Sequence, residues 1–262
     1  MYSAKRLAVA GVTLVALVGP SFAADMAVRA PRVYAPPFSW SSCYIGGNVG
    51  GAWSRSDFTT SLDPGTHLTL PGNIAAVGAA GTGSATDTGI IGGGQIGCNW
   101  QSGVWVWGLE ADFDGVSGRP TLTSGGTLST GDAFAIVNST KANWLATVRP
   151  RVGYAVDRSL FYATGGVAFT HLSYTQSYSD TLFAAVGGSS ASTTSTGWTV
   201  GGGWEYALTN RWTTKVEYLY TNFSSISATG GIVSATGGTN VLHGSSGDFA
   251  IQTLRAGLNY RF

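Results

Sequence analysis

The sequence predicts an all-β protein, a closed up-and-down barrel of eight antiparallel strands that crosses a membrane. Three observations predict this fold. Eight stretches alternate between an apolar and a polar face, the connections between them alternate between short and long, and the aromatic residues of the apolar faces fall at two heights. A period of two with one apolar face is typical of a strand that separates two environments.

Residues 249–262 show the alternation most clearly. One face is polar or small, and the other is apolar except at Gln252. The apolar face consists of Ala250, Leu254, Ala256, Leu258, Tyr260 and Phe262. An aromatic last residue in a strand pattern is unusual for a soluble chain, because chain ends are mostly polar and poorly ordered. The last strand of a soluble sandwich remains the alternative for this stretch alone.

Composition and the first residues place the chain outside the cytoplasm. Lys5 and Arg6 precede a short uncharged run at residues 7–18, and Ser21 and Ala23 fit a cleavage site, so we expect a signal peptide at residues 1–23. A retained helical anchor is the alternative. A proline-containing periplasmic leader follows at 24–40 and the barrel at 41–262. A net charge of +1 favours no nucleic-acid partner.

The eight predicted strands differ in how they are connected. Short turns follow the second, fourth and sixth strands, and long loops at 54–88, 116–142, 174–196 and 224–248 follow the others. These loops are rich in Gly, Ser, Thr and Ala and nearly uncharged. Short turns at one end, long loops at the other and an even strand number are typical of a membrane barrel. The predicted strands are 43–53, 89–101, 104–115, 143–156, 160–173, 197–207, 212–223 and 249–262.

The polar faces of consecutive strands also constrain the turns, because a hairpin keeps each face on one side. The second and third strands match if Gln101 lies opposite Val104, with a turn at 102–103. The other two short turns fall at 157–158 and 209–211. Pro150, on the apolar face of the fourth strand, cannot donate to the ladder, so we expect a β-bulge there.

Aromatic residues of the apolar faces form two belts, which is the arrangement expected at the two surfaces of a bilayer. A soluble sandwich has no reason to sort its aromatic residues by height. The belt near the short turns contains Trp100, Trp105, Tyr154, Phe161, Tyr206, Trp212, Tyr260 and Phe262. The belt near the long loops contains Trp53, Phe113, Trp144, Phe169, Trp198 and Tyr220.

Several segments together carry a resemblance to a known family. They are FSWSSCYIGGNVGGAW, GGGQIGCNWQ, VWGLEADFDG, YATGGVAFTHLSY, GWTVGGGWEYAL, WTTKVEYLY and LRAGLNYRF. The chain resembles the porin-family outer-membrane barrels of alphaproteobacteria, which are small OmpA-like or OmpX-like barrels. The resemblance implies short periplasmic turns, long extracellular loops and a place among outer-membrane lipids and lipopolysaccharide. It also implies that Gly257, Tyr260 and Phe262 are the signal read by the barrel assembly machinery.

Charged residues on the polar faces balance in sign, and we expect them to pair inside the barrel because isolated buried charges are costly. An eight-stranded barrel is narrow enough for side chains to fill, so this network should close the lumen. The eight members are Glu110, Asp112, Glu205 and Glu217 with Arg149, Arg151, Lys215 and Arg255.

Cys43 and Cys98 fall on the apolar face at the periplasmic ends of neighbouring strands. An exported chain meets an oxidising compartment, so we expect a disulfide between them, with two free thiols as the alternative.

Two motifs suggest chemistry that we do not expect. Residues 92–97 fit G-x-G-x-x-G, but they lie inside a strand pattern with no helix after them. His171 and Ser173 have the spacing of a lipid A hydrolase pair, but no acidic residue is clearly placed on their face. His67 and His243 are far apart in loops, so no metal or cofactor site is expected.

The expected function is therefore that of a structural, non-enzymatic outer-membrane barrel that displays its loops at the surface. A receptor or adhesin that acts through the loops, a small pore and, more remotely, a lipid A hydrolase are the alternatives. The sequence does not identify a ligand for the loops.

Overall fold

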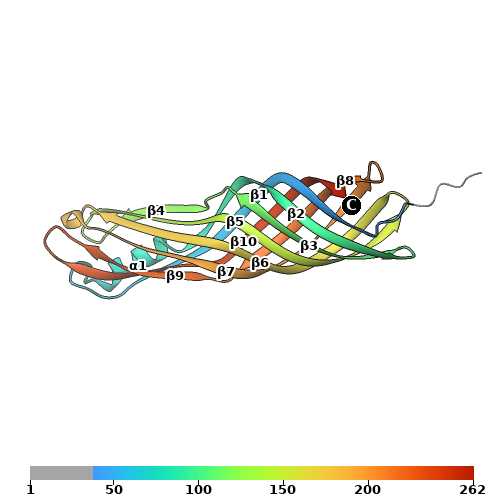
Figure 1. The fold of residues 1–262 in the computed structure, drawn as a ribbon. Coiled ribbons are helices and arrows are strands. Elements are labelled where there is room, and N and C mark those ends of the chain that lie inside the picture. Colours follow the sequence, from blue (N-terminus) through green and yellow to red (C-terminus); the bar gives the residue numbers. More distant parts are fainter. Residues whose placement is uncertain (1–37) are drawn as a thin grey trace, which may run out of the picture. The chain divides into compact units, whose positions relative to one another are not determined.

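Ten antiparallel strands make up most of residues 38–262, the part of the chain that this computed structural model describes (Figure 1). The predicted signal peptide at 1–23 and residues 24–37 of the predicted leader lie outside the described residues. The elements are β1 (Ser42–Leu62), α1 (Pro71–Ala80), β2 (Gly83–Ser102), β3 (Trp105–Val116), β4 (Thr121–Thr127), β5 (Ala133–Val156), β6 (Ser159–Asp180), η1 (Leu182–Ala184), β7 (Val186–Ala207), β8 (Trp212–Phe223), β9 (Ile226–Val233) and β10 (Thr239–Arg261). Within residues 38–262, no helix is long and apolar enough to cross a membrane.

The strands close into a ring, which confirms the predicted all-β antiparallel architecture. Its order is β1, β2, β3, β5, β6, β7, β8 and β10, and β10 pairs again with β1. The structure also contains two strands that the sequence did not predict. β4 pairs with β5, and β9 pairs with β10 and with the first residues of β7.

The end of the ring with the short turns largely follows the sequence. Val156 lies opposite Ser159, which gives the predicted turn at 157–158. The first turn lies one residue later than predicted, at 103–104, because Ser102 pairs with Trp105. Gly103 has a φ of 60° there, a conformation that glycine adopts without a steric penalty. The shift preserves the parity of the hairpin, so every side chain keeps its predicted face.

The opposite end differs from the prediction, because most residues assigned to long loops are in strands. We call the aromatic belt near the short turns the lower belt and the other the upper belt. Beyond the upper belt the chain continues in four pieces, which we call the extension: 54–90, 117–142, 171–196 and 224–250. Only residues 181–185 connect β6 to β7. The small residues of these segments are typical of loops, but here they let strands pack closely. A Cβ at Gly187 would lie 2.6 Å from the Cα of Ile232.

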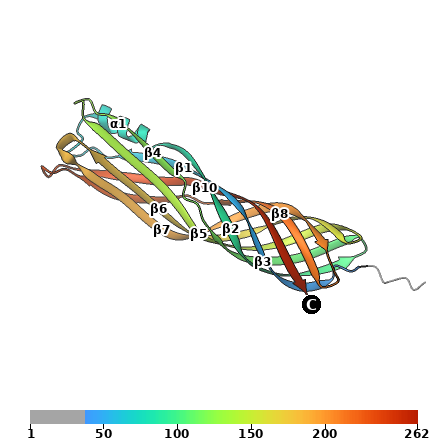
Figure 2. The same ribbon diagram turned by 90° about the horizontal axis from the view of Figure 1, so that it is seen from above.

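The extension consists of two groups of paired strands. One group is β2, β1, β10 and β9, and the other is β4, β5, β6 and β7. They meet at the tip, where Val186 pairs with Val233. An apolar cluster that includes Leu62, Ile136 and Ile232 lies between them, and Val77 of α1 packs into it. Figure 2 shows α1 at this end of the strands.

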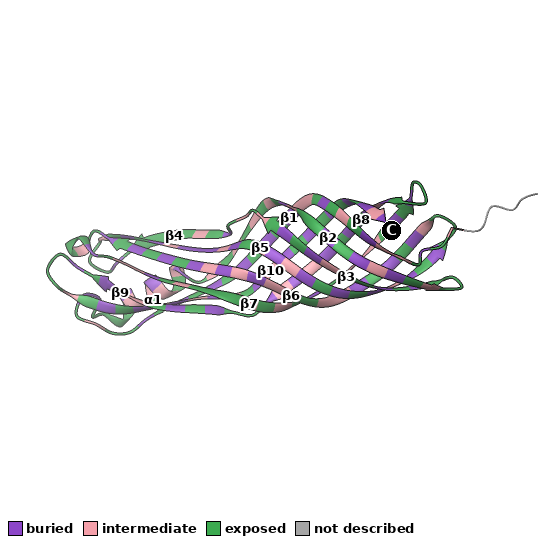
Figure 3. Cartoon of the chain, viewed as in Figure 1, coloured by how far each residue is buried: buried purple, intermediate pink, exposed green. Residues whose placement is uncertain are grey.

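The burial pattern of the ring is inverted relative to that of a soluble protein. Buried and exposed residues alternate along each strand (Figure 3). The exposed set is apolar and includes Ile90, Trp107 and Phe113, whereas the buried set carries the charges. Apolar-out and polar-in alternation is characteristic of strands that face lipid.

The ladder between β5 and β6 contains one irregularity, and it is not at the predicted position. The register is the same on both sides of Pro150, so no bulge forms there. The register shifts instead between Ala142 and Leu145. Thr164 donates a hydrogen bond to the Pro150 carbonyl at 3.0 Å, next to the point where proline cannot donate.

Candidate functional site

The candidate site is the charged centre of the ring, which is built by alternation along five strands. All eight predicted charges point inward and are at most 5 % exposed. Asp114 joins them as a fifth acidic residue, so four cations face five carboxyl groups. Asp114 was not predicted as a member although it shares the even-numbered face of Glu110 and Asp112, because the other eight charges already balance in sign.

Ion pairs cross the full width of the ring. β3 and β8 lie on opposite sides of the ring, four strands apart in the order. Lys215 of β8 nevertheless places its Nζ 2.8 Å from Oε1 of Glu110 on β3. Arg149 of β5 contacts the same Glu110 oxygen at 2.7 Å and Oε1 of Glu217 at 3.3 Å. These contacts place charged side chains at the centre of the ring.

Arg255 makes the second half of the network. Its Nη2 lies 2.7 Å from Oε1 of Glu217 and 3.0 Å from Oδ2 of Asp112. Its Nη1 lies 2.5 Å from Oδ2 of Asp114. The planar guanidinium suits several carboxylates at once, which explains why three of the four cations here are arginines.

Arg151 lies on the side of the network that faces the short turns. Its Nη1 contacts Glu205 at 3.2 Å, and its guanidinium lies about 5 Å from the rings of Tyr44 and Tyr162. Tyr44 also donates to Glu110 at 2.5 Å. A Cβ at Gly97 would meet the Tyr44 ring at 2.5 Å, so glycine is required there for the tyrosine to lie flat. Gly97 therefore packs against a side chain, and Gly92, Gly93 and Gly94 of the same motif lie in β2 against the backbone of neighbouring strands, so the motif is not a nucleotide-binding loop.

Apolar layers cover the network on both sides. Toward the short turns, Trp40, Val106 and Leu160 form one buried cluster. Toward the extension, Ile91 and Leu145 belong to another. Trp40 is fully buried, although the sequence placed it at the end of the leader. The charged centre therefore lies between two apolar clusters.

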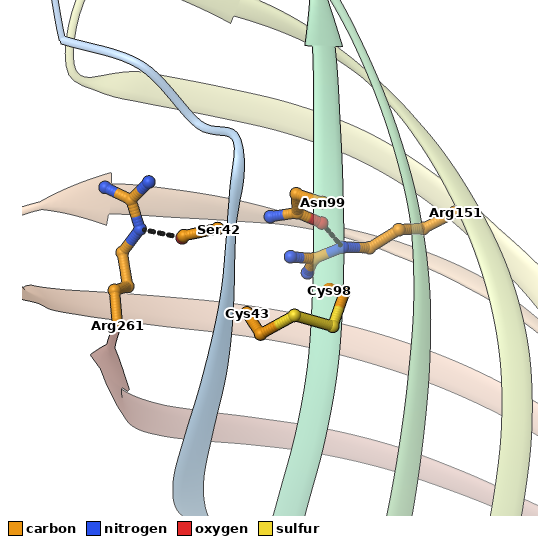
Figure 4. Close-up of a disulfide and its surroundings, with 6 residues drawn as sticks. All are labelled: Ser42, Cys43, Cys98, Asn99, Arg151 and Arg261. Carbon is orange, nitrogen blue, oxygen red and sulfur yellow. Dashed lines mark hydrogen bonds between the residues drawn. A yellow bond between two sulfur atoms is a disulfide. The ribbon is translucent and has the colours of Figure 1, made fainter.

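The predicted disulfide is present and links the first two strands. Cys43 and Cys98 are direct cross-strand partners with Cα atoms 3.9 Å apart (Figure 4). Two inward-facing hydrogen bonds lie beside it. Arg151 donates to Asn99 at 2.9 Å, and Arg261 donates to Ser42 at 2.8 Å.

The last residues close the ring beside this disulfide. The Phe262 N–H donates to the Cys43 carbonyl at 3.1 Å. The Tyr260 ring packs edge-on against Trp212, with centroids 5.2 Å apart. Gly257 faces inward, and a Cβ added to it would lie 3.3 Å from Cε of Lys215. These three residues therefore belong to the seam between β10 and its neighbours.

The other residues considered for chemistry are dispersed. His171 and Ser173 both face outward, and neither side chain hydrogen-bonds to another of residues 38–262. His243 contacts exposed Asp63 at 3.1 Å. In the same described part of the chain, no group of three or more His, Cys, Asp or Glu side chains is arranged to hold a metal ion.

A buried polar cluster in the extension was not predicted. His67 Nε2 lies 2.7 Å from Oδ2 of Asp180, and both side chains are fully buried. Tyr178 donates to the same oxygen at 2.7 Å. Burial, and next the contact with Asp180, raises the pKa of Tyr178 above its ordinary value, so the phenol keeps its proton and can donate. The cluster holds residues 63–70 against the end of β6.

Comparisons with known proteins agree with this geometry. The model of a family described as outer membrane protein beta-barrel domain matches residues 21–262. The 31 kDa outer-membrane immunogenic protein of Brucella melitensis is 35% identical over 250 residues, which cover 92% of this chain and 93% of that protein. The 22 kDa outer membrane protein of Rhizobium leguminosarum is 37% identical over 135 residues, 51% of this chain and 53% of that protein.

Among solved structures, the attachment invasion locus protein Ail of Yersinia pestis is similar to this chain with a TM-score of 0.37 and 14% identity. The similarity covers 86% of this chain and all of Ail. Similarity at this level supports no functional argument.

Proposed function

Because the chain belongs to the family of outer-membrane protein β-barrel domains, we propose that it is a structural outer-membrane barrel with a closed lumen. The chain is an outer-membrane protein, as its relatives are. β3 and β8 contain 12 residues each, close to the length of roughly 9 to 11 residues that a tilted strand needs to span a bilayer. In this proposal the eight ring strands cross the membrane, and the extension projects from the cell.

One observation carries the closed lumen: the 2.8 Å contact between Lys215 and Glu110, which joins opposite sides of the ring. An ion would have to pass two apolar layers and displace this contact. An aqueous channel generally needs about twice as many strands.

Conductance of the purified monomer in a planar bilayer tests the proposal. We expect no large, steady steps of a single size. A variant in which Lys215 and Glu110 are both replaced by alanine serves as the opened control. Stable single-size steps from the wild-type protein, reduced when inward charges are replaced by bulkier neutral residues, would contradict the proposal.

The proposal also assigns the protein no enzymatic role. The His171 and Ser173 side chains lack an acidic partner among the described residues, which a serine nucleophile and its base would need. Lipid A acylation in cells that express Ser173→Ala should equal that in cells with the wild type.

A surface-binding function is the second candidate, and the tip of the extension favours it. Phe183 has a φ of 57° and is 54% exposed, next to Val186, which is 64% exposed. A non-glycine residue held in this strained conformation points to a functional constraint. The test replaces residues 182–185 with a short polar turn and measures attachment of cells that display the protein to an immobilised partner. Attachment should be abolished if the tip binds the partner. It should be unchanged if the rest of the barrel binds the partner.

A further inference from the structure

The only register shift between β5 and β6 lies at the height where the strands leave the membrane. Ala142 pairs with Leu172 and Leu145 with Thr170, so Asn143 and Trp144 together face His171. This two-against-one arrangement is a β-bulge. The inner neighbours Ala142 and Leu145 are buried, whereas Asn143 and Trp144 both turn outward.

Two cations lie directly beside the bulge. Lys141 precedes it on β5 and pairs with Ser173 of β6. The Thr140 N–H donates to the Pro120 carbonyl at 3.1 Å, which continues the β4–β5 register and places exposed Arg119 opposite Lys141. We call Arg119, Lys141, Asn143, Trp144 and His171 the bulge patch.

The upper aromatic belt fixes the height of the bulge patch. The Trp144 ring stacks on Phe113 with centroids 5.6 Å apart. Phe113 is 60% exposed on the lipid-facing side. Since aromatic belts lie at headgroup level, Lys141 and Arg119, a few residues farther along the strands, lie among the headgroups.

The charges of the bulge patch are available to a ligand. Neither the Lys141 nor the Arg119 side chain makes an ion pair within residues 38–262, whereas Arg55, at the same level on β1, pairs with Asp57 at 3.1 Å. The Asp87 carboxylate accepts a hydrogen bond from the backbone N–H of Arg119 at 2.6 Å. Besides Arg119 and Lys141, the described part of the extension contains one further Lys or Arg, which is Arg55.

We propose that the bulge patch binds a phosphate on the sugar headgroup of a glycolipid in the outer leaflet. Lys141 and Arg119 supply the charge for the phosphate, because ammonium and guanidinium groups are its usual partners. The Asn143 amide and the His171 ring supply hydrogen-bonding groups for sugar hydroxyls. Trp144 lies between the headgroup and the acyl chains, a position that amphipathic rings favour. Because the bulge patch lies beside the upper aromatic belt, a membrane lipid is a better fit to it than a dissolved anion.

Binding of phosphorylated lipid A to the full chain in detergent micelles tests this proposal. The double variant R119Q/K141Q should bind it about 30-fold more weakly at low salt, since each basic residue near an anionic membrane surface contributes about 1 kcal/mol. The wild type should bind dephosphorylated lipid A about as weakly as the double variant binds the phosphorylated form.

Arg211, an exposed cation at the opposite end of the ring, provides the matched control. R211Q should bind phosphorylated lipid A as the wild type does, and heat-modifiable migration should show that all variants are folded barrels. Equal binding by the wild type and the double variant would overturn the proposal, as would equal binding of the two lipid A forms. Competition by inorganic phosphate at the lipid's own concentration would also overturn it, because it would identify a site for the free anion.

Discussion

At the scale of single residues, alternation predicted where the charges lie but not how they pair. Parity placed Glu110, Arg149 and Lys215 on the inner face, and the structure keeps them there. The contact between Lys215 and Glu110 could not be predicted, because it depends on strand order and stagger around the ring rather than on spacing along the chain. The roles of Tyr44 and Tyr162 were not predicted, because tyrosine also occurs on the lipid-facing side of other strands, as at Tyr154 and Tyr206.

Arg149 is the residue with which the network can best be tested. Arg149→Ala removes a guanidinium that contacts Glu110, Asp112 and Glu217 and leaves these carboxylates short of a cation. We expect the free energy of unfolding to fall by about 3 kcal/mol. Urea unfolding of the protein in micelles measures this, with Arg211→Ala as a control for loss of an exposed cation. An unchanged midpoint would show that the network does not stabilise the barrel.

At the scale of elements, the strands of the ring were predictable and those of the extension were not. Large apolar and aromatic residues mark the lipid-facing strands. In β4, β7 and β9 the outward residues are mostly Gly, Ser, Thr and Ala, which are also common in loops. These segments become strands because they pair with neighbouring strands, β4 with β5, β7 with β6, and β9 with β10. The residues of a segment do not by themselves indicate which strand lies beside it.

The disulfide between β1 and β2 should form in the native protein and stabilise it. Alkylation of protein taken from the membrane without reductant should label neither Cys43 nor Cys98, because both sulfurs are in the bridge. Replacing both by serine should lower the free energy of unfolding by about 2–4 kcal/mol, since the bridge restricts the unfolded chain. Complete labelling of both thiols before reduction would contradict this.

The seam between β10 and β1 is the element on which assembly should depend. Deleting Phe262 removes an aromatic side chain of the lower belt and the N–H that bonds to Cys43. We expect lower amounts in the outer membrane and normal amounts exported to the periplasm, because Tyr260 and Phe262 are proposed to be read during assembly. Fractionation with antibody detection compares the two pools, and Phe262→Tyr is the conservative control. Normal outer-membrane amounts of the deletion would refute the assignment.

At the scale of the whole molecule, paired strands in place of loops predict resistance to proteases. Arg55 and Lys141 lie in β1 and β5, and Arg119 precedes a proline, so trypsin finds few accessible bonds in the folded extension. We expect the extension to survive trypsin on intact cells and to be cut after boiling. Cleavage after Lys141 at equal rates in folded and boiled protein would show that this part is a loop.

The two faces of the extension also differ in how freely they can change. Along the strands of the extension, buried and exposed residues alternate (Figure 3), and buried apolar residues form a shared core. Substitutions should therefore be tolerated at every second residue and rejected at the residues between. Proteins descended from one such barrel can therefore differ at half of the residues of the extension and keep the same fold, so that their exposed surfaces become unrelated.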